Sequence, residues 1–256
     1  MRRFSVCGKE FDASVVVFDK DGLLFKSEAF WRELMQARVR AAEKHLNTGQ
    51  ICEWLELMEA GYVCEDDRVR VTRVTPDGVT AVAAPEEEIM ITGTLLMQQM
   101  HTKWPVAREL AREIFEEGDA TIDMEAAISP QEGFPDVFRR LYEAGIPYGI
   151  ATSDNLTRAR QSINMYDDYD HLDFVISPTE VAHNKPEPDM IEMVADRYSI
   201  KPSQIIMIGD SYVDVMMAKN AGSIGIGIPE FDDMAEKMKP YATVMAQSLN
   251  DIQIID

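Results

Sequence analysis

Two aspartates stand two positions apart directly after an apolar run near the N-terminus. The run Ser14–Phe18 is followed by Asp19, Lys20, Asp21 and Gly22. Side chains two apart on an extended chain lie on one side, so both acids are predicted to face a ligand beyond the end of a strand. Paired carboxylates attract a divalent cation and can divide labour, one ionised and one partly protonated. Taken alone, the pattern is equally typical of a strand that ends in an ordinary Asp-Gly turn.

A hydroxyl pair and a lysine follow later in the chain. Thr152 and Ser153 come directly after the apolar run Tyr148–Ala151, and a hydroxyl there can hold a phosphate oxygen beside the free amides of a helix start. Ser153, Asp154 and Asn155 are all good N-caps, so helix capping alone is the alternative explanation. Lys185 stands before Pro186, which predicts a positioned point charge. A surface lysine in a Pro-rich loop is the alternative.

A second acidic pair follows the apolar run Ile205–Ile208. Asp210 comes after Gly209, and Asp214 lies one helical turn later on the same face. Such a pair can complete a site for a hard cation, and Mg²⁺ prefers oxygen ligands. A capping residue with a solvated acid is the alternative interpretation.

These residues need a scaffold that brings strand ends together. Short apolar runs rich in Ile and Val alternate with helical patterns, which predicts an α/β, Rossmann-like, doubly wound parallel sheet covered on both faces. The predicted strands are Ser14–Phe18, Tyr148–Ala151, Phe174–Ile176, Ile205–Ile208 and Ile224–Ile228. The predicted helices between them are Asp136–Ala144, Leu156–Met165, Pro188–Tyr198 and Val213–Asn220. All the polar groups then converge on one edge of the sheet.

The segment 25–132 interrupts this alternation, which predicts a mostly helical domain inserted after the first strand, with 1–24 and 133–256 as the core. Its predicted helices are Glu28–Lys44, Ile51–Ala60, Pro85–Met100 and Pro105–Glu117. Arg68–Ala83 alternates Val with Arg and Thr around Pro76, Asp77 and Gly78, which favours a turn or hairpin there.

Composition narrows the classes of partner. The 256 residues carry a net charge of −20, which argues against nucleic acid or an anionic membrane surface. There is no 18-residue apolar stretch and no secretory signal pattern at the N-terminus. The three cysteines include no Cys-x-x-Cys pair, so reduced thiols in a cytoplasmic protein are expected. An anionic substrate must find a local positive field from a metal ion, a lysine or a helix N-terminus.

In combination, the polar groups resemble the four motifs of the haloacid dehalogenase (HAD) superfamily. The order is an acid pair, a hydroxyl, a lysine and a second acid pair, each after a predicted strand, and the insert stands where that superfamily carries a helical C1 cap. The likeness is to the phosphoglycolate phosphatase-like and β-phosphoglucomutase-like group. The matching residues are Asp19, Asp21, Thr152, Lys185, Asp210 and Asp214.

The resemblance implies a role for each residue. Asp19 would attack phosphorus, and Asp21 would be the acid for the leaving group and then the base for water. Thr152, Ser153, Lys185 and Gly22 would bind the phosphoryl group. The Mg²⁺ ligands would be Asp19, Asp21 through its backbone carbonyl, and Asp210, with Asp214 as an orienting acid.

The function expected from this resemblance is a Mg²⁺-dependent phosphatase that acts on a small phosphorylated metabolite. A phosphomutase of the β-phosphoglucomutase type is the runner-up, although no His occurs in Lys26–Trp31, where mutases usually carry one. A catalytically inactive HAD scaffold is the alternative from another class. The oligomeric state is left open.

Overall fold

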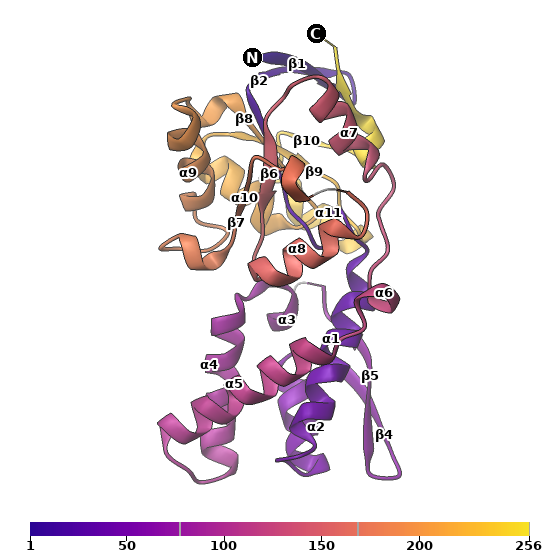
Figure 1. The fold of residues 1–256 in the computed structure, drawn as a ribbon, viewed down its shortest axis with the longest axis vertical. Coiled ribbons are helices and arrows are strands. Elements are labelled where there is room, and N and C mark those ends of the chain that lie inside the picture. Colours follow the sequence, from indigo (N-terminus) through magenta and orange to yellow (C-terminus); the bar gives the residue numbers. More distant parts are fainter. Residues whose placement is uncertain (77, 168, 256) are drawn as a thin grey trace. The chain divides into compact units, whose positions relative to one another are not determined.

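The chain folds into two compact units, which we call the core unit and the inserted unit (Figure 1). The core unit comprises Met1–Lys26 and Ser129–Asp256, and the inserted unit comprises Ser27–Ile128. The computed structural model describes residues 1–76, 78–167 and 169–255.

A six-stranded sheet, parallel throughout, forms the centre of the core unit (Figure 1). Its order is β10-β9-β8-β3-β6-β7. The strands are Val15–Phe18 (β3), Tyr148–Ala151 (β6), Phe174–Ile176 (β7), Ile205–Gly209 (β8), Ile224–Gly227 (β9) and Val244–Met245 (β10). The predicted α/β parallel sheet is confirmed. β3 lies between β6 and β8, so the residues just beyond the end of β3 are flanked by those beyond the ends of its two neighbours.

Helices cover both faces of this sheet, which is why its strands are continuous apolar runs. Val15 and Val17 pack in one cluster with Met190 and Met217, which come from two helices of the C-terminal half. Phe18 points to the opposite face, where its ring centroid lies 5.1 Å from that of Phe138. The main helices of the core unit are Asp136–Glu143 (α7), Leu156–Asn164 (α8), Asp189–Tyr198 (α9), Tyr212–Ala221 (α10) and Asp232–Met238 (α11).

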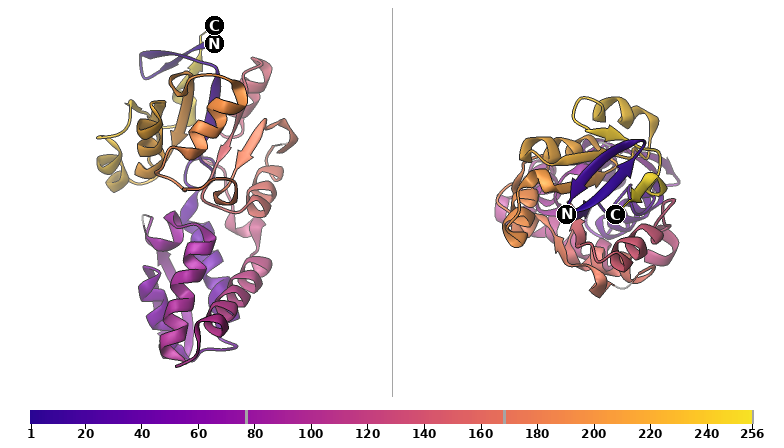
Figure 2. Two further views of the ribbon diagram at one scale, coloured as in Figure 1. Left: turned by 90° about the vertical axis from the view of Figure 1, so that its left-hand side faces the viewer. Right: turned by 90° about the horizontal axis from the view of Figure 1, so that it is seen from above.

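A small antiparallel sheet corrects the prediction that the insert follows the first strand of the chain. Arg2–Val6 (β1) and Lys9–Ala13 (β2) precede β3, and β1 also pairs with Ile252–Ile254 (β11). Figure 2 shows these terminal strands side by side. They were missed because both strands of the hairpin are short and largely exposed, so neither presents a long apolar run. The insert therefore follows the third strand of the chain, which is the first of the parallel sheet.

The inserted unit is helical apart from one hairpin, whose position also differs from the prediction. Ala60–Glu65 (β4) and Arg68–Val74 (β5) pair across a turn at Asp66 and Asp67, both of which have positive φ. The expected turn at Pro76-Asp77-Gly78 is wrong as a hairpin turn, because a short helix begins after Gly78; Asp77 itself lies outside the described residues. The helices are Ser27–Ala42 (α1), Thr48–Leu57 (α2), Val79–Val82 (α3), Pro85–Gln99 (α4), Trp104–Thr121 (α5) and Met124–Ala127 (α6).

The helices and the cysteines bear on the questions of membrane spans and disulfide bonds. None of the helices in the described part of the chain is both long enough and apolar enough to span a bilayer. Cys7, Cys52 and Cys64 are free thiols.

Candidate active site

The carboxyl edge of the sheet collects the residues that come after its central strands. Asp19 follows β3, and its backbone N–H donates to the carbonyl of Ile208 on β8 at 2.8 Å. Thr152 follows β6, and its N–H donates to Ile176 on β7 at 3.0 Å. Because all these strands run in one direction, their ends lie side by side, and the side chains beyond them can share a ligand.

Lys185 joins two of the predicted acids. Its ammonium donates to Asp19 Oδ1 at 2.6 Å and to Asp214 Oδ1 at 2.7 Å, and all three side chains are buried. Burial alone would lower the pKa of the Lys185 ammonium, but the two carboxylates raise it above its ordinary value. Lys185 therefore stays charged at neutral pH, as an electrostatic partner of both acids.

Three carboxylates crowd into this space. Asp19, Asp210 and Asp214 each have an oxygen within 4.8 Å of the others. Burial raises the pKa of Asp19 to about 7, against the effect of Lys185 and together with the charges of Asp214 and Asp21. Burial also raises the pKa of Asp210 well above its ordinary value, with further contributions from Asp19 and Asp214. One ammonium does not neutralise three acids, and hard oxygen donors short of positive charge are the donor set that Mg²⁺ prefers.

Gly22 makes room for Asp210. The φ of Gly22 is +83°, and a Cβ built there would lie 2.0 Å from Asp210 Oδ2. The Gly22 N–H donates to Phe25 O at 2.8 Å, so this amide is already used within the turn. Gly22 thus lies close to an acid of the cluster, and its part in phosphate binding stays a prediction.

Asp214 has both carboxylate oxygens engaged. Oδ1 accepts from Lys185, while Oδ2 accepts from the Ser211 N–H at 3.1 Å and from the Ser211 hydroxyl at 2.8 Å. These bonds tie the lysine to the start of α10. These bonds favour a role for Asp214 in orienting Lys185 rather than in binding a metal ion directly.

Asp21, the second acid of the pair, contacts a different lysine from the one that Asp19 contacts. Its Oδ1 lies 2.5 Å from the ammonium of Lys20, which is completely buried and also lies 3.1 Å from Asp154 Oδ2. Burial raises the pKa of Asp21, and Lys20 opposes that rise. Within the described residues, the Asp21 side chain is not in the cluster of three acids. Its prediction as a metal ligand concerned its backbone carbonyl, and it stays a prediction.

Thr152 and Ser153 lie on the loop between β6 and α8. Thr152 is buried, and its Oγ1 accepts the N–H of Asp154 at 3.0 Å, which leaves the hydroxyl proton to donate to another group. Ser153 Oγ accepts from the side-chain amide of Asn184 at 3.4 Å. The capping residue of α8 is Asn155, which accepts from the N–H of Arg158. Thr152 is therefore not needed as a cap.

Sequence reasoning missed two members of this region, Lys20 and Asp154. The signals were present. A lysine stands inside an otherwise apolar and acidic stretch, and Asp154 has Arg158 four residues later on the same helical face.

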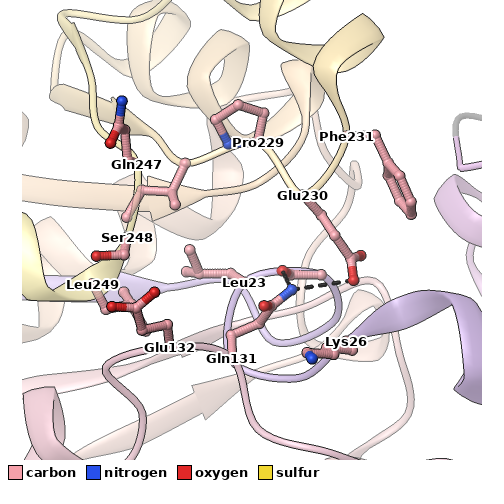
Figure 3. A pocket seen from close by; sticks show the side chains of 12 residues that line it. Leu23, Lys26, Gln131, Glu132, Pro229, Glu230, Phe231, Gln247, Ser248 and Leu249 are labelled. Atoms are coloured by element: carbon pink, nitrogen blue, oxygen red, sulfur yellow. Dashed lines mark hydrogen bonds between the residues drawn. The ribbon is translucent and has the colours of Figure 1, made fainter.

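A polar pocket of about 360 Å³ adjoins Gly22 in the core unit. Figure 3 shows the Gln131 side chain among the residues that line it. The amide nitrogen of Gln131 donates to the Gly22 carbonyl at 2.9 Å and to Glu230 Oε1 at 3.1 Å. The carboxylate of Glu230 adds to the rise in the pKa of Asp210. Gln131 thus fastens the turn after β3 to the loop after β9.

Comparisons with known proteins identify the family of this chain. A family model described as haloacid dehalogenase-like hydrolase matches residues 13–222. Phosphoglycolate phosphatase of Escherichia coli is 29% identical over 120 residues, which cover 46% of this chain and 47% of that protein. Pyrophosphatase PpaX of Bacillus velezensis is 29% identical over 130 residues, which cover 49% of this chain and 58% of that protein. The chain thus spans about half the length of these curated relatives.

Solved structures share the fold. A predicted phosphoglycolate phosphatase from Haemophilus somnus superposes with a TM-score of 0.67 at 12% identity, over 93% of this chain and 96% of the other. At such an identity, the likeness shows the fold alone.

Proposed function

The chain belongs to the haloacid dehalogenase-like hydrolases, and from that membership we propose that it is a Mg²⁺-dependent phosphatase of small phosphomonoesters. The observation that carries the proposal is the placement of Asp19. Its carboxylate lies beside the Lys185 ammonium and within a cluster of acids at the carboxyl edge of a parallel sheet. A nucleophile, a neutralising charge and metal-ligating oxygens are the parts that phosphoryl transfer needs.

In the first proposed step, the Asp19 carboxylate attacks phosphorus. An Oδ–P bond forms while the bond from phosphorus to the leaving oxygen breaks, and Asp21 gives that oxygen its proton. In the second step, water attacks the phosphorus of the aspartyl-phosphate, Asp21 takes the proton of that water, and phosphate leaves with Asp19 restored. Atoms and charge balance across the cycle, and the net reaction is hydrolysis of a phosphomonoester.

The remaining residues handle charge. Lys185 and the Thr152 hydroxyl would donate to phosphoryl oxygens, with Ser153 beside them. Mg²⁺ would be held by Asp19, Asp210 and the backbone carbonyl of Asp21, and it would supply the positive charge that lets an anionic ester approach a carboxylate.

The substrate class we propose is a small phosphorylated metabolite, with phosphoglycolate as the first candidate. The proposal draws on the name of the Escherichia coli relative, and on the chain's net charge of −20, which disfavours polyanionic partners such as nucleic acids. We assign the inserted unit the part of a cap domain and place the protein in the cytoplasm; both assignments belong to this proposal.

The test is phosphate release from 4-nitrophenyl phosphate and from a panel of metabolites that includes phosphoglycolate, sugar phosphates and pyrophosphate. We expect release with Mg²⁺, none with EDTA, and none from Asp19→Asn. Asp196→Asn, an exposed acid of the same unit, is the matched control and should behave as the unsubstituted protein. Absence of metal-dependent release would favour the inactive scaffold, and an isomerised sugar phosphate without release would favour the mutase.

A further inference from the structure

Lys20 is a buried cation that the proposed reaction leaves without a role. Its side chain is 0% exposed although it stands between the two acids of the proposed site. A buried ammonium is stable only when it is paired, and here Asp21 Oδ1 at 2.5 Å and Asp154 Oδ2 at 3.1 Å pair with it. The two carboxylates thus offset the charge of the ammonium inside the protein.

The far side of this contact is anchored. Asp154 Oδ1 accepts from the Asn155 N–H at 2.7 Å and from Arg158 Nε at 2.7 Å, and both Asp154 and Arg158 are almost completely buried. Asp154 also donates its N–H to Thr152 Oγ1. Lys20 therefore bridges the turn after β3 to the start of α8, and its ammonium is fixed by groups that are themselves held in place.

The backbone of Asp21 lies in an isolated β-bridge with Phe25 and not in a strand, and this bridge does not fix the side chain. Asp21 lies beyond the end of β3, beside Gly22, whose φ is positive, and its side chain is 14% exposed. A carboxyl group on a turn can rotate about two side-chain bonds. The contact with Lys20 fixes one of its oxygens and hence the direction in which the other one points.

The chemistry of the contact also decides where a proton can sit. An ammonium only donates hydrogen bonds, so Asp21 Oδ1 must be an acceptor. When Asp21 carries a proton, the O–H bond is then on Oδ2, the oxygen turned away from Lys20.

We propose that Lys20 is a positioning residue that holds the Asp21 carboxyl so that Oδ2 carries the proton passed to the leaving group. Lys20 itself acts only through Asp21, because it is enclosed by protein. The inference rests on the proposed phosphatase function. In the step concerned, the O–H bond of Asp21 breaks and an O–H bond to the leaving oxygen forms, while the P–O bond gives its electron pair to that oxygen.

The test compares two substrates in Lys20→Met, which keeps a long unbranched side chain, shorter by the terminal nitrogen position, and removes the charge. An alkyl phosphate has a poor leaving group that needs a proton, whereas 2,4-dinitrophenyl phosphate has one that does not. The readout is kcat/KM, because it reports the steps up to the first irreversible one. General acid catalysis contributes about 10²–10⁴-fold, so we expect a loss of about 10–100-fold on the alkyl phosphate and of less than about 3-fold on the activated ester.

Two further variants calibrate the result. Asp21→Asn removes the acid itself and should show the same selectivity with a larger loss. Lys201→Met makes the same exchange at an exposed lysine of the same unit and should change neither rate. The fold is expected to survive Lys20→Met because Asp154 keeps its bonds to Arg158 and Asn155. If that variant does not fold, Lys20→Gln undergoes the same comparison.

The outcomes separate this inference from the proposed function. An unsubstituted protein that releases no phosphate from either ester would overturn both. If the unsubstituted protein is active, equal losses on both esters would assign Lys20 a structural role only, and unchanged rates would assign it none. Either result would overturn this inference alone.

Discussion

The acid cluster makes the metal-free protein sensitive to rising pH. The pKa of Asp19 is raised from 3.8 to about 7 by burial, so the folded protein holds a proton there that the unfolded chain releases. The stabilising contribution is fully present below pH 3.8 and is lost as the pH rises to about 7. Linkage then gives a loss in the free energy of unfolding of about 4 kcal/mol over the whole range, of which about 2 kcal/mol falls between pH 5 and pH 7.

Mg²⁺ should reverse this dependence. The ion would be held by ionised carboxylates, so its binding should release the proton of Asp19 and become tighter as the pH rises. In saturating Mg²⁺ the protein should therefore be stabilised more at pH 7 than at pH 5. The assay is urea unfolding at pH 5, 6 and 7, once with EDTA and once with Mg²⁺, with the proton release checked by calorimetry in buffers of different ionisation enthalpy.

Asp19→Asn removes the titration of this carboxyl group, and because Asp19 also raises the pKa of Asp210, the accompanying change at Asp210 acts in the same direction. With EDTA, the difference in unfolding free energy between the variant and the unsubstituted protein should grow by about 2 kcal/mol from pH 5 to pH 7, in favour of the variant. The reasoning is refuted if the two proteins show parallel pH dependences, or if Mg²⁺ stabilises the unsubstituted protein equally at both pH values.

Two more substitutions test the geometry of the cluster. Gly22→Ala places a Cβ against the carboxylate of Asp210 and should weaken Mg²⁺ binding at least about 10-fold, as measured by calorimetry. Gly222 has a similar positive φ but open space around it, so Gly222→Ala should lower stability without weakening Mg²⁺ binding. Equal effects on Mg²⁺ binding in both variants would contradict the steric explanation. Lys185→Met removes the ammonium that pairs with Asp19, so kcat for phosphate release should fall by about 10²–10³-fold with Mg²⁺ present. Activity within about 5-fold of the unsubstituted protein would exclude Lys185 as the neutralising charge.

Five strands of the six-stranded sheet could be predicted because each is a short apolar run, whereas β10 was missed because it has only two residues. Tyr148–Ala151 and Phe174–Ile176 have the predicted bounds, since a continuous apolar run between turn residues fits only a strand buried on both faces. The hairpin of the inserted unit could not be placed in the same way. Its turn uses Asp66 and Asp67 in the left-handed conformation, which aspartate tolerates but does not signal as strongly as the Asp-Gly pair nearby.

Some contacts of the candidate site could likewise be predicted from the sequence, and others could not. That Asp19 and Asp210 lie together follows from the neighbouring ends of β3 and β8, and Asp214 is brought in by the first turn of α10. Lys185 lies in a loop well beyond the end of β7, so strand ends alone do not place it. The roles given to these residues stay proposals. The contact of Lys20 with Asp21 does not follow, because alternation along a strand puts neighbours on opposite sides. The chain leaves the strand before that point, and the Lys20 carbonyl already accepts from the Leu24 N–H at 3.0 Å.

The distribution of charge in the site bears on the order in which ligands bind. Each of its two buried lysines is already committed, Lys185 to Asp19 and Asp214, and Lys20 to Asp21 and Asp154. Without a metal ion, a phosphate dianion would be repelled by the carboxylates, because both lysines already pair with these acids and the chain carries a net charge of −20. Bound Mg²⁺ would change this balance, since it would neutralise carboxylates and let the Lys185 ammonium donate part of its hydrogen bonding to phosphoryl oxygens. The electrostatics of the site therefore favour an order in which the metal ion binds before the substrate.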